Sequence, residues 1–111
     1  MSYIYIASPY TDPDWEVMVK RFTLAEEVTA QLLRQGDHIY SPIVHCHELA
    51  QKHELPTDFE FWQNYNRAML SKASELYVLA MDGWEDSKGV QAEREFAKQC
   101  GIPVTIVEEL E

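Results

Sequence analysis

The chain has 111 residues, 46% hydrophobic and 25% charged, so we expect a single globular domain. Its formal net charge of −10 argues against a broad nucleic-acid interface, which needs a basic face, but allows a small phosphorylated ligand held by backbone N–H groups. Because we find neither a signal-peptide pattern nor an apolar run long enough to span a membrane, we expect a cytoplasmic protein with free thiols at Cys46 and Cys100.

Strands and helices are expected to alternate along the chain, without internal repeats or linkers. Residues 3–8 (YIYIAS) are β-branched and aromatic, as is typical of a buried strand, whereas the apolar residues between Trp15 and Arg34 follow a helical period. In chain order, the sequence predicts strands at 3–8, 38–44, 75–81 and 103–109, and helices at 13–34, 45–55, 59–73 and 88–100.

Polar residues mark the expected helix starts. Asp12 before Pro13 has the pattern of an N-cap followed by proline at the first helical position. Either Thr57 or Asp58 caps the third helix. Ser87 caps the last one.

This alternation indicates an α/β fold with a parallel sheet and helices on both faces. Ligands of such sheets bind beyond the carboxyl ends of the strands, where the strand order reverses. That rule selects the segments after the first three strands, which are 7–12 (ASPYTD), 41–47 (SPIVHCH) and 82–89 (DGWEDSKG).

The last helix start combines groups that suit a sugar phosphate. Ser87 offers a hydroxyl and Gly89 a close approach to free backbone N–H groups, at the positive end of the helix. Glu93 follows about 9 Å further along the helix, comparable with the span from a sugar phosphate to its anomeric carbon. Its carboxylate could attack that carbon. Alternatively, Ser87 only caps the helix and Glu93 is a solvated charge, and no dinucleotide or P-loop motif is present.

The stretch HCH at 45–47 allows three interpretations. His45, Cys46 and His47 could ligate zinc, but no second ligand pair stands at typical spacing, so we expect no metal. The histidines could instead line a pocket, or all three residues could be structural.

Aromatic residues are also ambiguous. Tyr10, Trp62, Tyr65 and Trp84 could stack on a nucleobase or pack against the sheet. Packing is favoured for Trp62. Trp84 lies in a predicted loop, where packing alone explains it less easily.

Three stretches carry a family resemblance. YIYIASPY, YSPIVHCHEL and LYVLAMDGWEDSKGVQAERE together resemble the nucleoside 2-deoxyribosyltransferase superfamily, in particular a short branch with the motifs SPY, SPIxHxH and DGWxxSxGxxxE. The resemblance covers nearly the whole chain. It implies a flavodoxin-like (Rossmann-like) three-layer sandwich around a four- to five-stranded parallel sheet, and cleavage of an N-glycosidic bond.

The same resemblance assigns roles to residues. Glu93 matches the nucleophile and Tyr5 the tyrosine that orients it. The spacing of Ser87, Gly89 and Glu93 is similar to that of hydrolases of nucleoside 5′-monophosphates, in which the serine and glycine hold the phosphate. With the segments selected above, the expected substrate-binding residues are Ser8, Pro9, Tyr10, His45, His47, Trp84, Ser87 and Gly89.

One position departs from the family pattern. Asn66 stands where an aspartate is usual in the site, and an amide cannot act as an acid or base, although it can hydrogen-bond a sugar or base. Asp82 and Asp86 are possible substitutes.

Taken together, the residues and the resemblance predict a hydrolase of (deoxy)nucleoside 5′-monophosphates that works through a glycosyl ester on Glu93, without metal or organic cofactor. The alternatives are a deoxyribosyltransferase and a catalytically silent nucleotide-binding module. The resemblance also implies a homodimer or homotetramer. No nucleic acid or membrane partner is expected.

Overall fold

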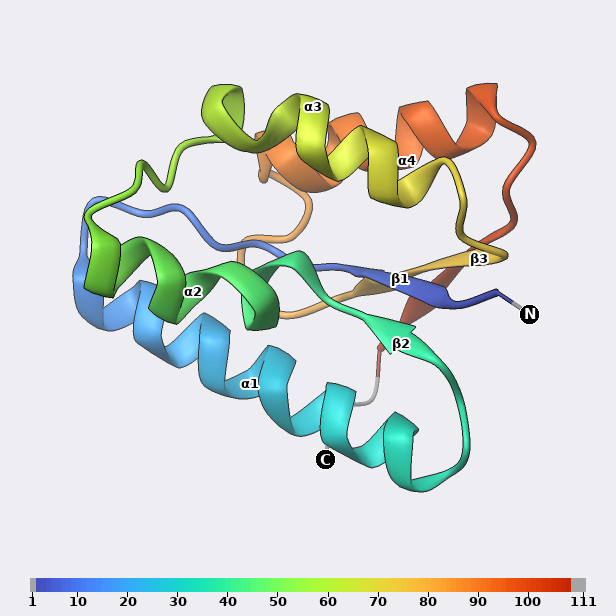
Figure 1. The fold of residues 1–111 in the computed structure, drawn as a ribbon, viewed down its shortest axis with the longest axis horizontal. Coiled ribbons are helices and arrows are strands. Elements are labelled where there is room, and N and C mark those ends of the chain that lie inside the picture. The colour runs from blue at the N-terminus through green and yellow to red at the C-terminus, as the bar shows by residue number, and fades with distance from the viewer. Residues whose placement is uncertain (1, 109–111) are drawn as a thin grey trace.

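A computed structural model describes residues 2–108 of the chain (Figure 1). Helices and strands alternate in the order predicted from the sequence. They are β1 (Ile4–Ala7), α1 (Trp15–Arg34), β2 (Ile39–Tyr40), α2 (Pro42–His53), α3 (Phe59–Leu70), β3 (Glu75–Leu79), α4 (Lys88–Gln99) and β4 (Val104–Val107).

Within residues 2–108, four strands form one parallel sheet in the order β2-β1-β3-β4. Helices α3 and α4 cover one face, and α1 and α2 lie on the other side (Figure 1). The protein is therefore an α/β three-layer sandwich of the flavodoxin-like kind, with four strands rather than five in the described range.

The alternation of side chains along β1 divides the core between the two faces. Tyr5 and Ala7 belong to the cluster that includes Val90 and Ala97 of α4. Ile6 points the other way, into a cluster packed against residues of α1. Because Tyr5 is fully buried on the α4 side, its hydroxyl is directed toward that helix.

The second strand is shorter than the prediction of 38–44, which was wrong beyond Tyr40. Ser41 has extended backbone angles and accepts a hydrogen bond from the Val44 N–H, so it caps a helix that begins at Pro42. Proline suits the first helical position because it lacks an N–H that would be unpaired there. The apolar run Ile43–Val44 therefore continues as helix rather than as strand.

Other boundaries differ by a few residues. Helix α1 is capped by Asp14 rather than Asp12, whose carboxylate instead accepts a hydrogen bond from the Asp14 N–H. Asp58 rather than Thr57 caps α3. Helix α3 ends at Leu70, before Ala73, and β3 ends at Leu79, before Met81. The predicted last strand spans Val104–Val107, and its final residue, Glu109, lies outside the described residues.

The sheet order creates a switch point between β1 and β3. From β1 the chain moves outward to β2, and from β2 it crosses back to β3 and continues to β4. The connections after β1 and β3 therefore leave in opposite directions and open a crevice at the carboxyl ends of these strands. Among the described residues, no helix is both long and apolar enough to cross a membrane.

Candidate active site

A cavity of about 580 Å³ lies at this switch point. Its wall is built from the loops after β1 and β3, the N-terminal portions of α3 and α4, part of α2, and one residue of α1. The wall includes six of the predicted site residues: Ser8, Tyr10, Asn66, Ser87, Gly89 and Glu93.

The carboxyl of Glu93 is the central titratable group of the cavity. The Tyr5 hydroxyl, buried beneath it on β1, donates a hydrogen bond to Glu93 Oε2. Burial raises the pKa of Glu93 to about 7, and the bond from Tyr5 opposes this shift. Burial first, and then the Glu93 charge, raise the pKa of Tyr5 well above its usual value, so Tyr5 remains a donor. Tyr5 thus orients the Glu93 carboxyl through one of its two oxygens, and burial holds the pKa of this carboxyl above its ordinary value.

The start of α4 forms a second part of the same wall. Ser87 caps the helix by accepting a hydrogen bond from the Val90 N–H. A Cβ at Gly89 would lie 3.6 Å from Phe59 Cδ1, so glycine keeps this stretch of backbone open toward the cavity. Lys88 extends from the first helical position and forms a 3.2 Å ion pair with Glu60 of α3. The positive end of α4 therefore faces the cavity that Glu93 lines.

Two cavity residues carry buried polar atoms without a hydrogen-bond partner in the described part of the chain. They are Ser8 Oγ, on a residue only 7% exposed, and Asn66 Oδ1. Since an unpaired buried polar atom is costly, both are suited to pairing with a ligand or water in the cavity.

Residues 2–109 match the family model described as Domain of unknown function (DUF1937). The chain belongs to this family. A search of curated proteins found no match. The match therefore spans the whole described fold, and the description of the family names no activity.

In this DUF1937 member, His47 does not line the cavity but lies behind Tyr10. His47 Nδ1 is 2.5 Å from the Tyr10 hydroxyl, and the imidazole stacks on Trp15 and Phe22 of α1. Burial lowers the pKa of His47, although the nearby Glu48 and Glu26 oppose the shift. A neutral His47 can accept a hydrogen bond from the Tyr10 hydroxyl, and this contact holds Tyr10, which does reach the cavity.

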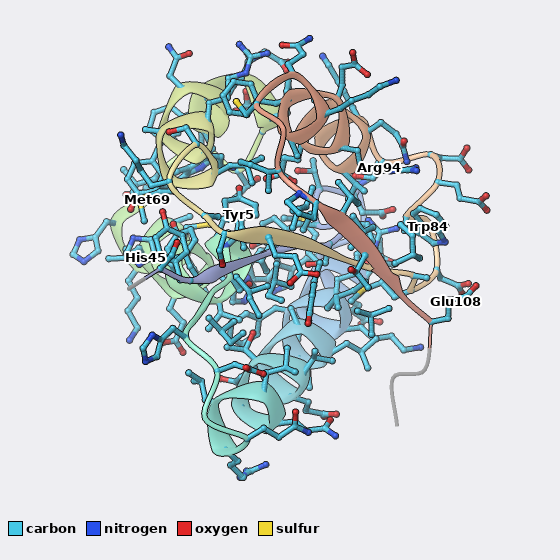
Figure 2. The ribbon with its side chains drawn as sticks, turned by 90° about the vertical axis from the view of Figure 1, so that its right-hand side faces the viewer. Tyr5, His45, Met69, Trp84, Arg94 and Glu108 are labelled. Atoms are coloured by element: carbon cyan, nitrogen blue, oxygen red, sulfur yellow. The ribbon has the colours of Figure 1, made fainter. Side chains whose placement is uncertain are left out.

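The remaining predicted binding residues also lie outside the cavity wall. His45 is exposed and stacks on Tyr65, with 3.2 Å between its Nε2 and the Tyr65 hydroxyl. Trp84 packs against the core, and the Arg94 Cζ atom lies 5.6 Å from the centre of the Trp84 ring. Figure 2 shows this pair well apart from Tyr5 and His45. Pro9 is fully buried. Trp62, by contrast, lines the cavity and donates a 2.7 Å hydrogen bond to the Pro56 carbonyl.

The prediction from the sequence missed several cavity residues. Among them is Arg21, which brings a positive charge to the wall. Arg21 belongs to α1, and its guanidinium reaches the carbonyls of Tyr10 and Thr11. The sequence of this long amphipathic helix does not mark Arg21 as a site residue, because only the fold brings the loop that Arg21 contacts close to it. Cys46 also lines the cavity, and burial raises its pKa to about 11, so it is a neutral thiol there.

The wall can bind an anion and present a carboxylate, but it offers no group of metal ligands. Within residues 2–108, no set of three or more His, Cys, Asp or Glu side chains is arranged to hold a metal ion. His45 and His47, the two histidines of the HCH stretch, make separate contacts with Tyr65 and Tyr10. The cavity wall thus combines the Glu93 carboxyl, which Tyr5 hydrogen-bonds, with the start of α4.

Proposed function

We propose that the chain is an N-glycosidase that hydrolyses the base–sugar bond of a (deoxy)nucleoside 5′-monophosphate through a glycosyl ester on Glu93. The observation that supports this is a single cavity lined by both the Tyr5-bound carboxyl of Glu93 and the N-terminus of α4. Ser87 and Glu93 are six residues apart, or about 9 Å along the helix, which suits a 5′-phosphate at one end and an anomeric carbon at the other.

The proposed reaction has two steps. Because Tyr5 donates to Oε2, the other oxygen of Glu93 is left to attack the anomeric carbon as the carbon–nitrogen bond to the base breaks. The base leaves with the bonding electron pair and takes up a proton. Water then attacks the same carbon as the ester bond breaks, and it gives a proton back to the group that protonated the base. The products are free base, sugar 5-phosphate and a regenerated carboxylate.

The proton for the leaving base needs a source other than Asn66, whose amide cannot supply one. Both loop carboxyls that could substitute are exposed, but Asp86 lines the cavity and Asp82 does not. Asp86 is therefore the side chain that we assign to this step. Asn66, with its unpaired Oδ1, is assigned to hydrogen-bonding the sugar or base.

Base release from a panel of ribo- and deoxynucleotides, with and without the 5′-phosphate, tests the proposal directly. The expected result is release from 5′-monophosphates by the wild type and none by Glu93→Gln, with Glu95→Gln, an exposed neighbour on the same helix, as the matched control. Undiminished release by Glu93→Gln would refute the mechanism. An excess of a second free base distinguishes the transferase, which would form a new nucleoside or nucleotide.

A second candidate is a binding module without turnover. It is favoured by Asn66, which lines the cavity where an acid would be needed, and by the raised pKa of Glu93, which lowers the ionised fraction at neutral pH. Saturable binding of a nucleoside 5′-monophosphate without base release across the panel would support this reading over the enzyme.

A further inference from the structure

Arg21 joins the two loops that form the switch point. Its Nη1 donates to the carbonyls of Tyr10, at 3.3 Å, and Thr11, at 3.2 Å, in the loop after β1. Its Nη2 lies against Gly83 in the loop after β3, so closely that a Cβ there would be 2.5 Å away. Gly83 also has a φ of +88°, which favours glycine. The guanidinium is thus held in place at the cavity wall.

This guanidinium has no acidic partner in the described part of the chain. The ion pairs among residues 2–108 are Lys52–Glu48 and Lys88–Glu60, and neither includes Arg21. The chain has 19 acidic and only 9 basic Lys and Arg residues, so an unpaired, half-buried arginine is unexpected in such a protein. The hydrogen bonds that it makes use Nη1 alone, which leaves further donors of the five available.

None of the acidic residues that line the cavity forms an ion pair with Arg21, and most of them contact another group. Asp12 accepts a hydrogen bond from the Asp14 N–H, and Asp58 accepts one from Phe61 at the start of α3. Glu60 is paired with Lys88. Glu93 accepts the hydrogen bond from Tyr5. Lys88, the other cation of the wall, is paired with Glu60 at the surface, where both side chains are largely exposed, so Arg21 is the cation of the wall that has no acidic partner among the described residues.

A further observation indicates that the cavity is built to receive a polar ligand. Ser8, at the end of β1, is 7% exposed, lines the cavity, and has an Oγ without a hydrogen-bond partner among the described residues. The N-terminus of α4, with the backbone of Ser87 to Gly89, lines the same cavity. A planar guanidinium and a helix N-terminus are two arrangements that proteins use for phosphate.

We infer that Arg21 binds the phosphate group of the ligand together with the start of α4, and that it selects 5′-phosphorylated over unphosphorylated substrates. The identity of the ligand as a nucleotide rests on the proposed function, but binding of the phosphate requires no turnover. Arg21 would contribute charge and a fork of donors where Ser87 and Gly89 contribute backbone N–H groups.

Calorimetric binding of ribose 5-phosphate tests the inference without relying on catalysis. A charge-assisted hydrogen bond lost from such a site lowers affinity by about 10- to 100-fold, so Arg21→Gln should weaken binding by that factor. Lys20→Gln removes the same charge from an exposed neighbour on the same helix and should change affinity less than about 2-fold. Equal affinities of the two variants, or no binding by the wild type, would overturn the inference. If Arg21→Gln does not fold, Arg21→Lys keeps the charge without the fork and should still lose roughly 5-fold or more.

Turnover then separates this inference from the proposed function. If no base is released but Arg21→Gln still loses affinity for ribose 5-phosphate, the proposed function fails and the inference stands. If base is released, Arg21→Gln should lower kcat/KM for a 5′-monophosphate about 10- to 100-fold and for the unphosphorylated nucleoside less than about 3-fold. An equal loss on both substrates would mean that Arg21 only holds the two loops, and would overturn the inference alone.

Discussion

Replacing Glu93 by glutamine should stabilise the protein at alkaline pH. The carboxyl has a pKa of about 7 in the fold, against an ordinary value of 4.5, because burial disfavours its charge. Glutamine has the same shape, keeps an oxygen to accept the Tyr5 hydrogen bond, and carries no charge at any pH. The variant therefore removes the cost of a buried anion while preserving the packing.

The sign and size of the effect follow from proton linkage. Between pH 4.5 and about 7 the unfolded wild type loses the Glu93 proton while the folded wild type retains it, so wild-type stability falls as the pH rises. Above about pH 7 both states are ionised and the cost is constant. A difference of about 2.5 pH units corresponds to roughly 3 kcal/mol. Because Glu93 keeps some accessible surface toward the cavity, water there reduces this value, and we expect about 1–3 kcal/mol.

Urea unfolding followed by circular dichroism at pH 5.0 and 8.5 measures the effect. The free energy of unfolding of Glu93→Gln should exceed that of the wild type at pH 8.5, and most of the gain should be absent at pH 5.0. Glu95→Gln, which changes an exposed carboxyl two residues further along α4, should show no such pH-dependent gain. If the difference between Glu93→Gln and the wild type is the same at both pH values, the carboxyl is not destabilised by burial and the reasoning is wrong.

Three further predictions concern the cavity. The acid limb of kcat/KM for base release should have its midpoint near pH 7, where Glu93 ionises, and Tyr5→Phe should move that midpoint upward because the Tyr5 hydrogen bond lowers the pKa of Glu93; an unmoved pH–rate profile would contradict this. Gly89→Ala places its Cβ at an ordinary 3.6 Å from Phe59, so it should raise stability by up to about 1 kcal/mol in thermal unfolding while raising KM for a 5′-monophosphate, and an unchanged KM would count against a phosphate at this backbone. Ser87→Asp keeps an N-cap, so it should leave the melting temperature within a few degrees of the wild type but weaken ribose 5-phosphate binding by charge repulsion. Ser87→Ala, which removes the cap, should cost about 1 kcal/mol of stability. Equal ribose 5-phosphate affinity of Ser87→Asp and the wild type would exclude the phosphate from this helix start.

Local chemistry made much of the fold predictable from the sequence. The apolar, β-branched and aromatic residues of β1 and β3 were sufficient to predict strands. Ser87 was predicted as a cap, and Asp58 as one of two candidates, because a cap depends on its own next three residues. The predicted length of the second strand was wrong for a related reason. Ser41 and Pro42 form a local helix start that competes with the strand preference of Ile43 and Val44, and the helix start prevails.

The candidate site was less predictable where it depends on contacts distant in sequence. His47 was expected to line a pocket, but its environment is set by Trp15 and Phe22 of α1, about 30 residues earlier in the chain, which stack on its ring. Arg21 was missed because its contacts, with Tyr10, Thr11 and Gly83, arise only when two loops converge on one helix. Glu93 and Ser87 were expected near one another because one helix and its cap carry both at a set spacing, and both do line the cavity, whereas their roles were predicted from the resemblance.

Mass spectrometry of the protein quenched with acid during turnover tests the central claim most directly. A nucleoside 5′-monophosphate analogue with 2′-fluorine should slow hydrolysis of the glycosyl ester so that it accumulates. We predict that the peptide containing Glu93 gains the mass of the fluorinated sugar phosphate, that Glu95→Gln shows the same adduct, and that Glu93→Gln shows none. Base release by the wild type without any adduct on Glu93, or with an adduct on another residue, would contradict the assignment of Glu93 as the nucleophile.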